Sequence, residues 1–229
     1  MDAKSAKISP LRESFERLRD RTYATLDFSS GYPFWQEFVH CFLEYCDEAR
    51  LWNPPFSIVD REPDDAGQEH RVWFDASDGY YYKLTHPGFF GLNVIYRDEG
   101  DRHAHPLQYL ERWSLHNEMF GDAVEWLGCF KQEEDQFSIL IRQPAIQGTP
   151  ASDEEINSFF CEVGWEPFQV DGEGAFYVPK LGVVISDTHR GNLIKTSGGL
   201  LVPIDLRLQR MEGALRDAVV HMLESPNLK

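Results

Sequence analysis

The chain has 229 residues, of which 42% are hydrophobic and 14% aromatic, and its formal net charge is -16. Length and composition predict one globular domain of two lobes, or two small domains, with enough apolar residues for a packed core, and they exclude a disordered chain. Because an acidic surface repels phosphate backbones, we expect no binding to nucleic acid.

Two further features bear on the compartment. No window approaches the roughly 18 consecutive apolar residues that a membrane helix needs. Residues 1–20 mix Lys, Arg, Asp and Glu and lack the apolar core of a signal peptide. We therefore expect a cytoplasmic protein that does not enter a membrane. The cysteines form no CxxC pair, so we expect buried thiols in a reducing compartment at Cys41, Cys46, Cys129 and Cys161.

The first part of the chain predicts helices. Residues 11–26 form one helix, and residues 33–52 form a second in which apolar side chains recur every three or four positions. The run Asn-Pro-Pro at 53–55 ends it. Nothing in residues 1–55 indicates chemistry, so we predict a helical N-terminal extension that packs on a catalytic body.

From residue 56 onward the pattern favours strands. Residues 56–59 predict a short strand, and residues 70–76 and 80–85 predict a hairpin around the turn at 77–79. The remaining predicted elements are a helix over 106–120, strands over 124–130 and 137–141, a helix over 152–163, strands over 176–178, 183–186, 193–195 and 200–204, and a final helix over 207–223. Antiparallel strands with segregated helices predict an α+β fold.

The segment 183–206, VVISDTHRGNLIKTSGGLLVPIDL, carries the strongest chemical pattern. Asp187 and Asn192 are five positions apart, and Asp205 follows thirteen residues later, after a glycine-containing turn. Phosphoryl transfer needs a carboxylate near the attacking oxygen and oxygen ligands that hold Mg²⁺ against the nucleotide phosphates. A tight loop followed by a hairpin can bring three such side chains together. The pattern therefore favours a phosphotransferase site over three unrelated turn and helix caps.

At these residues the sequence resembles the protein-kinase-like superfamily. The run 187–192, DTHRGN, is similar to the D-x-H-x-G-N catalytic loop of aminoglycoside-type phosphotransferases, and it has the Asp-to-Asn spacing of the protein-kinase catalytic loop. The run 204–206 is similar to the magnesium-binding Asp motif. The resemblance implies that Asp187 is the catalytic base and that Asn192 and Asp205 ligate Mg²⁺.

The same resemblance implies roles for residues upstream. The second strand of the predicted hairpin is similar to the strand that carries the phosphate-contacting lysine, which makes Lys83 the candidate. Its implied ion-pair partner is Glu111 in the following helix, with Glu118 as the alternative. Gln143 would border the adenine of ATP, and Gly67 would belong to the loop that covers the phosphates.

A more extensive similarity is to the serine/threonine/tyrosine kinase-like domains of polyvalent proteins from phages and mobile elements. It covers about two thirds of the chain and is carried by YYKLTHPGFFG (81–91), YLERWSLHNEMFGD (109–122), IRQPAIQG (141–148) and residues 183–206. It implies a two-lobed kinase-like fold, with an N-lobe containing an antiparallel sheet over 56–145. A reduced C-lobe with the catalytic loop and the metal-binding Asp would span 146–229.

Several departures from protein kinases bear on function. Ile-Ser replaces His-Arg before Asp187, Leu-Arg replaces Phe-Gly after Asp205, and 24 residues follow Asp205. From this length we expect no activation segment and no full helical lobe that grips a peptide. These departures bear on protein-kinase activity more than on nucleotide binding. We expect an ATP- and Mg²⁺-dependent phosphotransferase whose acceptor is an unknown protein or small molecule.

Three alternatives remain open from the sequence. The first is a nucleotide-binding pseudokinase or interaction module without transfer activity. The second is transfer of the nucleotidyl group, which would use much the same residues. The third follows from the run 187–189, which also matches the Asp-x-His opening of two-metal phosphoesterases, although the further ligand pairs of those sites do not follow it.

Overall fold

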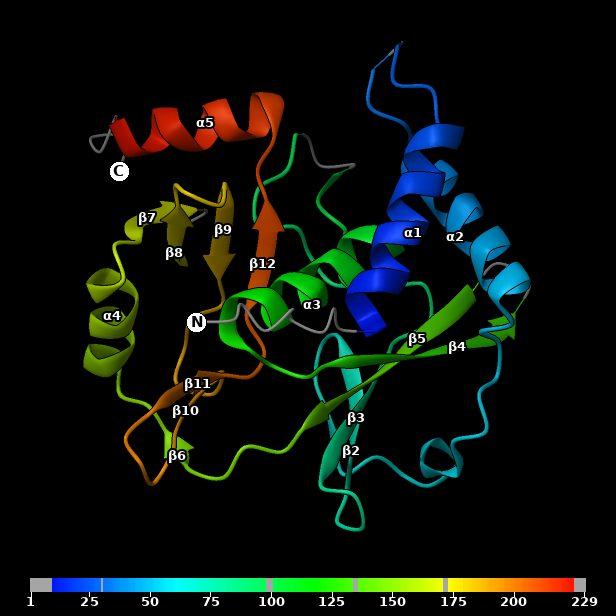
Figure 1. The fold of residues 1–229 in the computed structure, drawn as a ribbon, viewed down its shortest axis with the longest axis horizontal. Coiled ribbons are helices and arrows are strands. Elements are labelled where there is room, and N and C mark those ends of the chain that lie inside the picture. The colour runs from blue at the N-terminus through cyan, green and yellow to red at the C-terminus, as the bar shows by residue number, and fades with distance from the viewer. Residues whose placement is uncertain (1–9, 30, 98–100, 134–135, 171–172, 225–229) are drawn as a thin grey trace, which may run out of the picture. The chain divides into compact units, whose positions relative to one another are not determined.

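The structure is a computed structural model that describes residues 10–29, 31–97, 101–133, 136–170 and 173–224 (Figure 1). It divides into two compact units. The first comprises the chain up to Gly91 together with Ala104–Ala145, and the second comprises Leu92–His103 together with the chain from Ile146 onward. The chain combines helices with antiparallel sheets, which confirms the predicted α+β class. None of the described helices has the length and apolar character needed to cross a bilayer.

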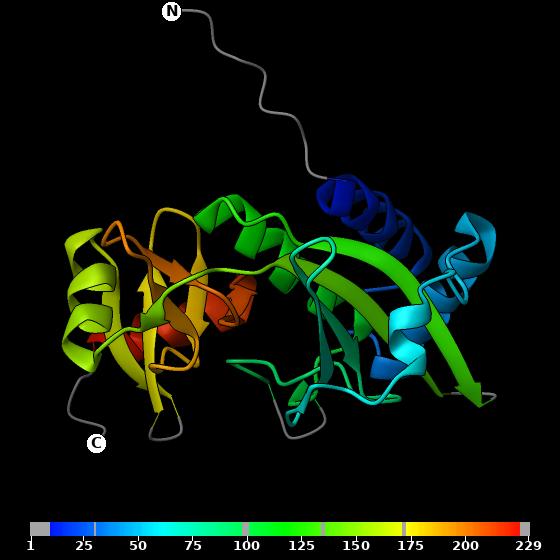
Figure 2. The same cartoon turned by 90° about the horizontal axis from the view of Figure 1, so that it is seen from below.

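The described part of the first unit contains three α-helices and a five-stranded antiparallel sheet in the order β1-β2-β3-β5-β4. Its elements are α1 (Pro10–Thr25), α2 (Trp35–Ala49), the 3-10 helix η1 (Ser57–Asp60), β1 (Asp65–Ala66), β2 (His70–Asp75), β3 (Tyr80–Thr85), α3 (Pro106–Phe120), β4 (Glu125–Glu133) and β5 (Gln136–Pro144). Figures 1 and 2 show β4 and β5 as a long curved hairpin. The predicted helix over 106–120 is confirmed.

The predicted strand over residues 56–59 is wrong. Residues 57–60 form the single 3-10 turn η1 instead. Its side chains Ile58 and Val59 pack on the sheet beside Trp73 and Leu140 without entering its hydrogen-bond ladder. The segment is apolar because it covers one face of the sheet, and not because it forms a further strand.

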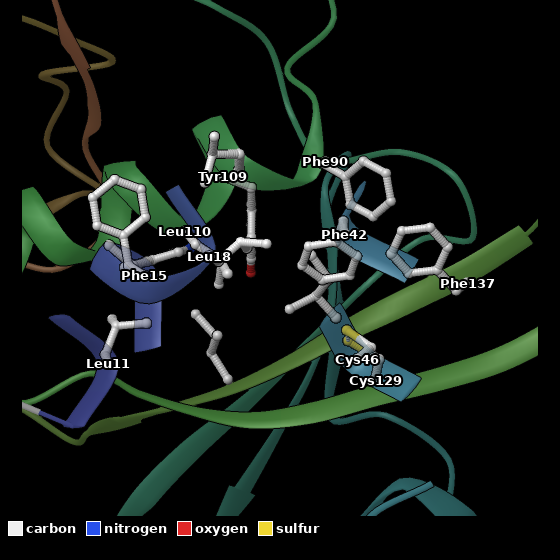
Figure 3. Packing of buried hydrophobic residues seen from close by; sticks show 14 of the residues in the cluster. Leu11, Phe15, Leu18, Phe42, Cys46, Phe90, Tyr109, Leu110, Cys129 and Phe137 are labelled. Atoms are coloured by element: carbon white, nitrogen blue, oxygen red, sulfur yellow. Dashed lines mark hydrogen bonds between the residues drawn. The ribbon is translucent and has the colours of Figure 1, made fainter. Parts of the chain in front are cut away.

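Helices α1, α2 and α3 share one hydrophobic core with the sheet (Figure 3). Side chains alternate between the two faces of a strand, and Ile139 and Ile141 of β5 point into this core. Phe42 of α2 stacks on Phe137 of β5 with ring centroids 5.2 Å apart. The N-terminal helices are thus part of the packing that holds the sheet of the first unit.

Three of the four cysteines are buried, as predicted. The Sγ atoms of Cys46 and Cys129 lie 3.8 Å apart within the core (Figure 3). Cys41 is also buried, but Cys161 is exposed, so the prediction is wrong for that residue. Helix α4 packs through its buried residues Ile156 and Phe160, and Cys161 is not one of them.

The second unit contains a four-stranded antiparallel sheet in the order β12-β9-β8-β7 and a smaller sheet in the order β11-β10-β6. Its elements are β6 (Thr149–Pro150), α4 (Asp153–Glu162), β7 (Glu166–Val170), β8 (Glu173–Val178), β9 (Val183–Ser186), β10 (Leu193–Lys195), β11 (Leu201–Pro203), β12 (Arg207–Arg210) and α5 (Gly213–Glu224). Phe160 of α4 contacts Phe176 with ring centroids 4.7 Å apart, whereas Leu215 and Val219 of α5 pack near Ala175. Because Ala175 and Phe176 are adjacent in β8, the two helices cover opposite faces of the sheet.

The predicted final helix is wrong in its first residues. Residues 207–210 form β12, which pairs with β9 in the register Arg207↔Ser186, and the helix begins only at Gly213. All four residues of β9 are buried, and β12 satisfies hydrogen-bonding groups along one edge of that strand. Because the backbone groups of a buried strand need hydrogen-bond partners, residues 207–210 form a strand despite their helical sequence pattern.

Gln209 fixes the segment Leu92–His103 to the second unit. Its Oε1 accepts hydrogen bonds from the N–H groups of Val94 (2.7 Å) and Ile95 (2.9 Å), and its Nε2 donates to the carbonyl oxygen of Ile95 (2.8 Å). The Gln209 side chain is buried. The side-chain amide of Gln209 thus forms hydrogen bonds with three backbone groups that lie outside the sheets.

We expect Gln209→Leu to lower the free energy of unfolding by about 3 kcal/mol, because it removes three hydrogen bonds and leaves buried backbone groups unpaired. Urea denaturation followed by tryptophan fluorescence measures this change. Gln147→Leu alters an exposed glutamine in the same unit and should change the free energy by no more than about 0.5 kcal/mol. A loss in Gln209→Leu no larger than that of the control would contradict the assignment.

Candidate active site

Strand β9 positions Asp187 at one end of the four-stranded sheet. The chain leaves the buried strand at Asp187, whose φ of 62° lies in the left-handed region. Aspartate tolerates this conformation better than most residues, because its short side chain can form local hydrogen bonds. Backbone strain of this kind concentrates at functional sites. The Asp187 side chain remains 28% exposed, so its carboxylate is accessible.

Asn192 connects Asp187 to the segment that carries Asp205. Its Nδ2 donates a 3.0 Å hydrogen bond to the carbonyl oxygen of Asp187. Its own carbonyl oxygen accepts a 2.9 Å hydrogen bond from the N–H of Ile204. The β10–β11 hairpin, in the register Leu193↔Pro203, brings these two stretches together. The spacing that marked these residues in the sequence therefore corresponds to a hairpin whose two ends meet beside the 187–192 loop.

Two basic side chains flank the Asp187 carboxylate. His189 Nε2 lies 3.4 Å from Oδ1, and Arg207 Nε lies 3.7 Å from Oδ2. Arg207 reaches this position because β12 pairs with β9. Arg207 is not among the site residues predicted from the sequence, and its place two residues after Asp205 is the one local signal that could have indicated it.

The oxygen donors in this part of the second unit fit Mg²⁺. Carboxylates and amide oxygens are the protein ligands this ion takes, usually together with water and phosphate oxygens. Because Nδ2 of Asn192 is the donor in its bond to Asp187, Oδ1 is the atom that could ligate a metal. The described residues contain no group of three or more His, Cys, Asp and Glu side chains arranged to hold a metal ion.

In the first unit, Lys83 lies in β3 with only 7% of its surface exposed. It pairs with Val72 of β2 and Ile141 of β5 in the sheet, on the face that carries α3. Its Nζ lies 4.8 Å from the centroid of the Trp113 ring, a cation–π distance. Most strand lysines are solvated, so this burial distinguishes Lys83 from an ordinary surface residue.

Helix α3 presents a stripe of polar and aromatic side chains to this face. His70 Nε2 lies 2.9 Å from the Tyr109 hydroxyl. Arg112 Nη1 donates to both carboxylate oxygens of Glu69 at 2.8 Å. Both contacts, like that of Trp113 with Lys83, lie on the side of the helix that faces β2 and β3.

Both predicted partners of Lys83 lie in α3, with Glu111 in the middle of the helix and Glu118 near its end. Glu118 Oε2 lies 3.7 Å from Arg12 Nη1 of α1. The pairing of Lys83 with Glu111 stays a prediction.

Gly67 lies in the turn between β1 and β2. Its N–H donates a 2.9 Å hydrogen bond to the carbonyl oxygen of His70, and its own carbonyl oxygen lies 3.0 Å from His86 Nε2. The same turn contains Glu69, which Arg112 holds. The turn that contains Gly67, which the sequence predicts to cover the phosphates, is therefore held to α3 by the contact of Arg112 with Glu69.

At the end of β5, Gln143 points toward the helical face of the sheet. Its Nε2 donates to Asp122 Oδ2, which also lies 3.1 Å from Nδ1 of the fully buried His116. Burial lowers the pKa of His116. Burial opposes ionisation of Asp122 and is the largest single effect, but the contacts with His116, the side-chain amide of Gln143 and the N–H of Ala123 together leave the pKa of Asp122 below its ordinary value. This series of contacts links Gln143 of β5, through Asp122, to His116 of α3.

We expect the free energy of unfolding to fall as the pH is lowered from 7 to 5. Because the pKa of His116 is lowered in the folded chain, the unfolded chain takes up that proton first, and stability present above pH 6.5 is lost below it. Urea denaturation at pH 7, 6 and 5 measures the slope. His116→Gln should reduce it by up to about 1.4 kcal/mol per pH unit. The control His221→Gln, at an exposed position, should keep the wild-type slope. Equal slopes in His116→Gln and wild type would refute this role.

A comparison with protein families places these residues in context. Residues 37–210 match the model of the family described as Serine/Threonine/Tyrosine Kinase found in polyvalent proteins. No curated protein and no solved structure matches the chain. The similarity to aminoglycoside-type phosphotransferases stays a resemblance of the catalytic loop. The family match spans more than half of the 229 residues and contains every candidate site residue from Gly67 to Asp205. The chain therefore has a kinase-like α+β fold and belongs to the family of serine/threonine/tyrosine kinases found in polyvalent proteins.

Proposed function

We propose that the chain is a phosphotransferase that uses ATP and Mg²⁺ and transfers a phosphoryl group to a hydroxyl of a protein or a small molecule. The observation that carries this proposal is the hydrogen-bonded link from Asp187 through Asn192 to Ile204, next to Asp205. It supports a common location for the carboxylate and the oxygen ligands that phosphoryl transfer needs. The family of the chain supports the same activity.

Each candidate residue has a role in this proposal. Asp187 orients the acceptor hydroxyl and takes its proton, while Asn192 and Asp205 hold Mg²⁺. When bound, the ion neutralises charge on the phosphate oxygens. Lys83 contacts the phosphates, and burial favours an ordered position for its ammonium group.

Two further positions would contact the nucleotide. Gly67 belongs to the turn over the phosphates. Gln143 marks the place where β5 ends and the chain would border the adenine.

The test is product formation by the full chain with ATP and Mg²⁺ and no added acceptor, so that water or the chain itself accepts the group. We expect slow formation of ADP that EDTA abolishes. Lys83→Met should lower this rate by about 100-fold, because a cation aimed at the reacting phosphates is removed. Lys131→Met, a change of an exposed lysine on the same sheet, should keep it.

The other products separate the alternatives. Release of pyrophosphate in place of ADP would indicate nucleotidyl transfer. ATP binding without any product would indicate a pseudokinase and would overturn the proposed activity. An unchanged rate in Lys83→Met would show that the lysine is assigned wrongly.

A further inference from the structure

A pocket of about 830 Å³ lies within the second unit and includes Asp187 in its lining. Its position follows from the strand register. Phe176 of β8 pairs with Ile185 of β9, so the chain after β9 emerges beside the first residues of β8, Glu173 and Gly174. The lining also includes Leu223 from the last turn of α5. Because all lining residues belong to the second unit, the pocket is a property of that unit alone.

The walls of the pocket are apolar on one part and acidic on another. Its apolar lining includes Met222, then Phe168 and Leu223, which pack with Ala175 on the α5 face of the sheet, and Phe176, which packs on α4 at the other face. Met222 is 41% exposed, so its side chain is accessible to a ligand. A cavity of this size with apolar walls and a few polar groups is typical of small-molecule sites, which measure about 300–1,000 Å³.

The charged groups narrow the class of ligand. Glu173 and Asp187 contribute carboxylates, and the described lining residues include no lysine or arginine. Asp187 already has Arg207 beside it, with Nε 3.7 Å from Oδ2, so Glu173 is the carboxylate that would repel a carboxylate or phosphate group of a ligand and attract an ammonium group. Two histidines, His189 and His221, add hydrogen-bonding groups.

We propose that this pocket is the acceptor site and that it takes a small molecule with an apolar or aromatic body, a hydroxyl and an ammonium group. This inference rests on the proposed phosphotransferase function. In the transfer step the acceptor oxygen forms a bond to the γ-phosphorus of ATP, and the bond from that phosphorus to the bridging oxygen breaks. The hydroxyl proton goes to the Asp187 carboxylate, and ADP leaves with the bond electrons.

The test uses two probes of similar size, tyramine and 4-hydroxyphenylacetate, which share a phenol and differ in the sign of their charge. Binding is followed without nucleotide in protein labelled with ¹³C at the methionine methyl groups. Tyramine should shift the Met222 signal and leave that of Met119 in α3 unchanged. 4-Hydroxyphenylacetate should bind at least about threefold more weakly.

A matched pair of variants tests the charge preference. Glu173→Gln should weaken tyramine binding by about threefold, the size expected for an exposed charge pair. Glu166→Gln removes an exposed carboxylate of β7 outside the lining and should have no effect. With ATP and Mg²⁺ added, tyramine should be converted to its O-phosphate.

The outcomes separate this inference from the proposed function. Equal binding of both probes, or no shift at Met222 with either, would overturn the inference even if ADP forms in the absence of acceptor. Tyramine that binds without being phosphorylated, in a preparation that does form ADP, would overturn the acceptor role. Absence of any ADP would instead overturn the proposed function.

Discussion

Replacing Asp187 by asparagine is expected to lower the rate of phosphoryl transfer by about 100- to 10,000-fold, the range for loss of a general base. Asparagine keeps the shape of the side chain but cannot accept the hydroxyl proton. It is also the substitution that best preserves the backbone, because Asp187 has a φ of 62° and asparagine tolerates the left-handed region. Alanine would combine a chemical change with backbone strain.

The rate of ADP formation measures this effect, and nucleotide binding measured on the same preparation shows whether the site is otherwise intact. We expect Asp187→Asn to bind ATP and Mg²⁺ with nearly wild-type affinity. Asp217→Asn, a change of an exposed aspartate in α5, is the control and should keep both properties. Full activity in Asp187→Asn would show that another group accepts the proton.

Replacing Asp205 by asparagine is expected to abolish the stabilisation of the chain by ATP and Mg²⁺ together. A ligand at about 100 times its dissociation constant stabilises the folded state by roughly 2.7 kcal/mol. For a chain of this length that corresponds to a rise of roughly 5–10 °C in the melting temperature. The rise should require both ATP and Mg²⁺, because the carboxylate of Asp205 acts through the metal.

Thermal melting with ATP, with Mg²⁺ and with both measures this prediction. Asp217→Asn again serves as the control and should melt like wild type in every condition. A wild-type rise in Asp205→Asn would exclude this carboxylate as a required metal ligand. A wild-type chain that shows no rise in any condition would count against the nucleotide site as a whole.

The hairpin between Asn192 and Asp205 could be predicted from the sequence because its geometry is local. The hydrogen bonds of Asn192 to Asp187 and to Ile204 follow from the spacing of these residues on one loop and one hairpin. The hairpin that carries Lys83 was predictable for the same reason. The burial of Lys83 could not be predicted, because it depends on α3 packing over that face of the sheet.

Features that depend on distant pairing could not be predicted. Arg207 reaches Asp187 only because β12 lies beside β9, and the sequence of residues 207–210 itself favoured a helix. The bidentate contact of Arg112 with Glu69 joins residues 43 positions apart. Gln209 places the segment Leu92–His103 in the second unit through bonds to Val94 and Ile95, and no local pattern marks it as their partner.

The most direct test of the central claim is hydrogen–deuterium exchange of the full chain with ATP and Mg²⁺. The proposal assigns phosphate contacts to Lys83 and metal ligation to Asn192 and Asp205. It predicts that amide exchange slows in both β3 and the segment 187–206, and only when ATP and Mg²⁺ are present together. Unchanged exchange in both segments would contradict the account and leave the kinase-like fold without a nucleotide site at these residues.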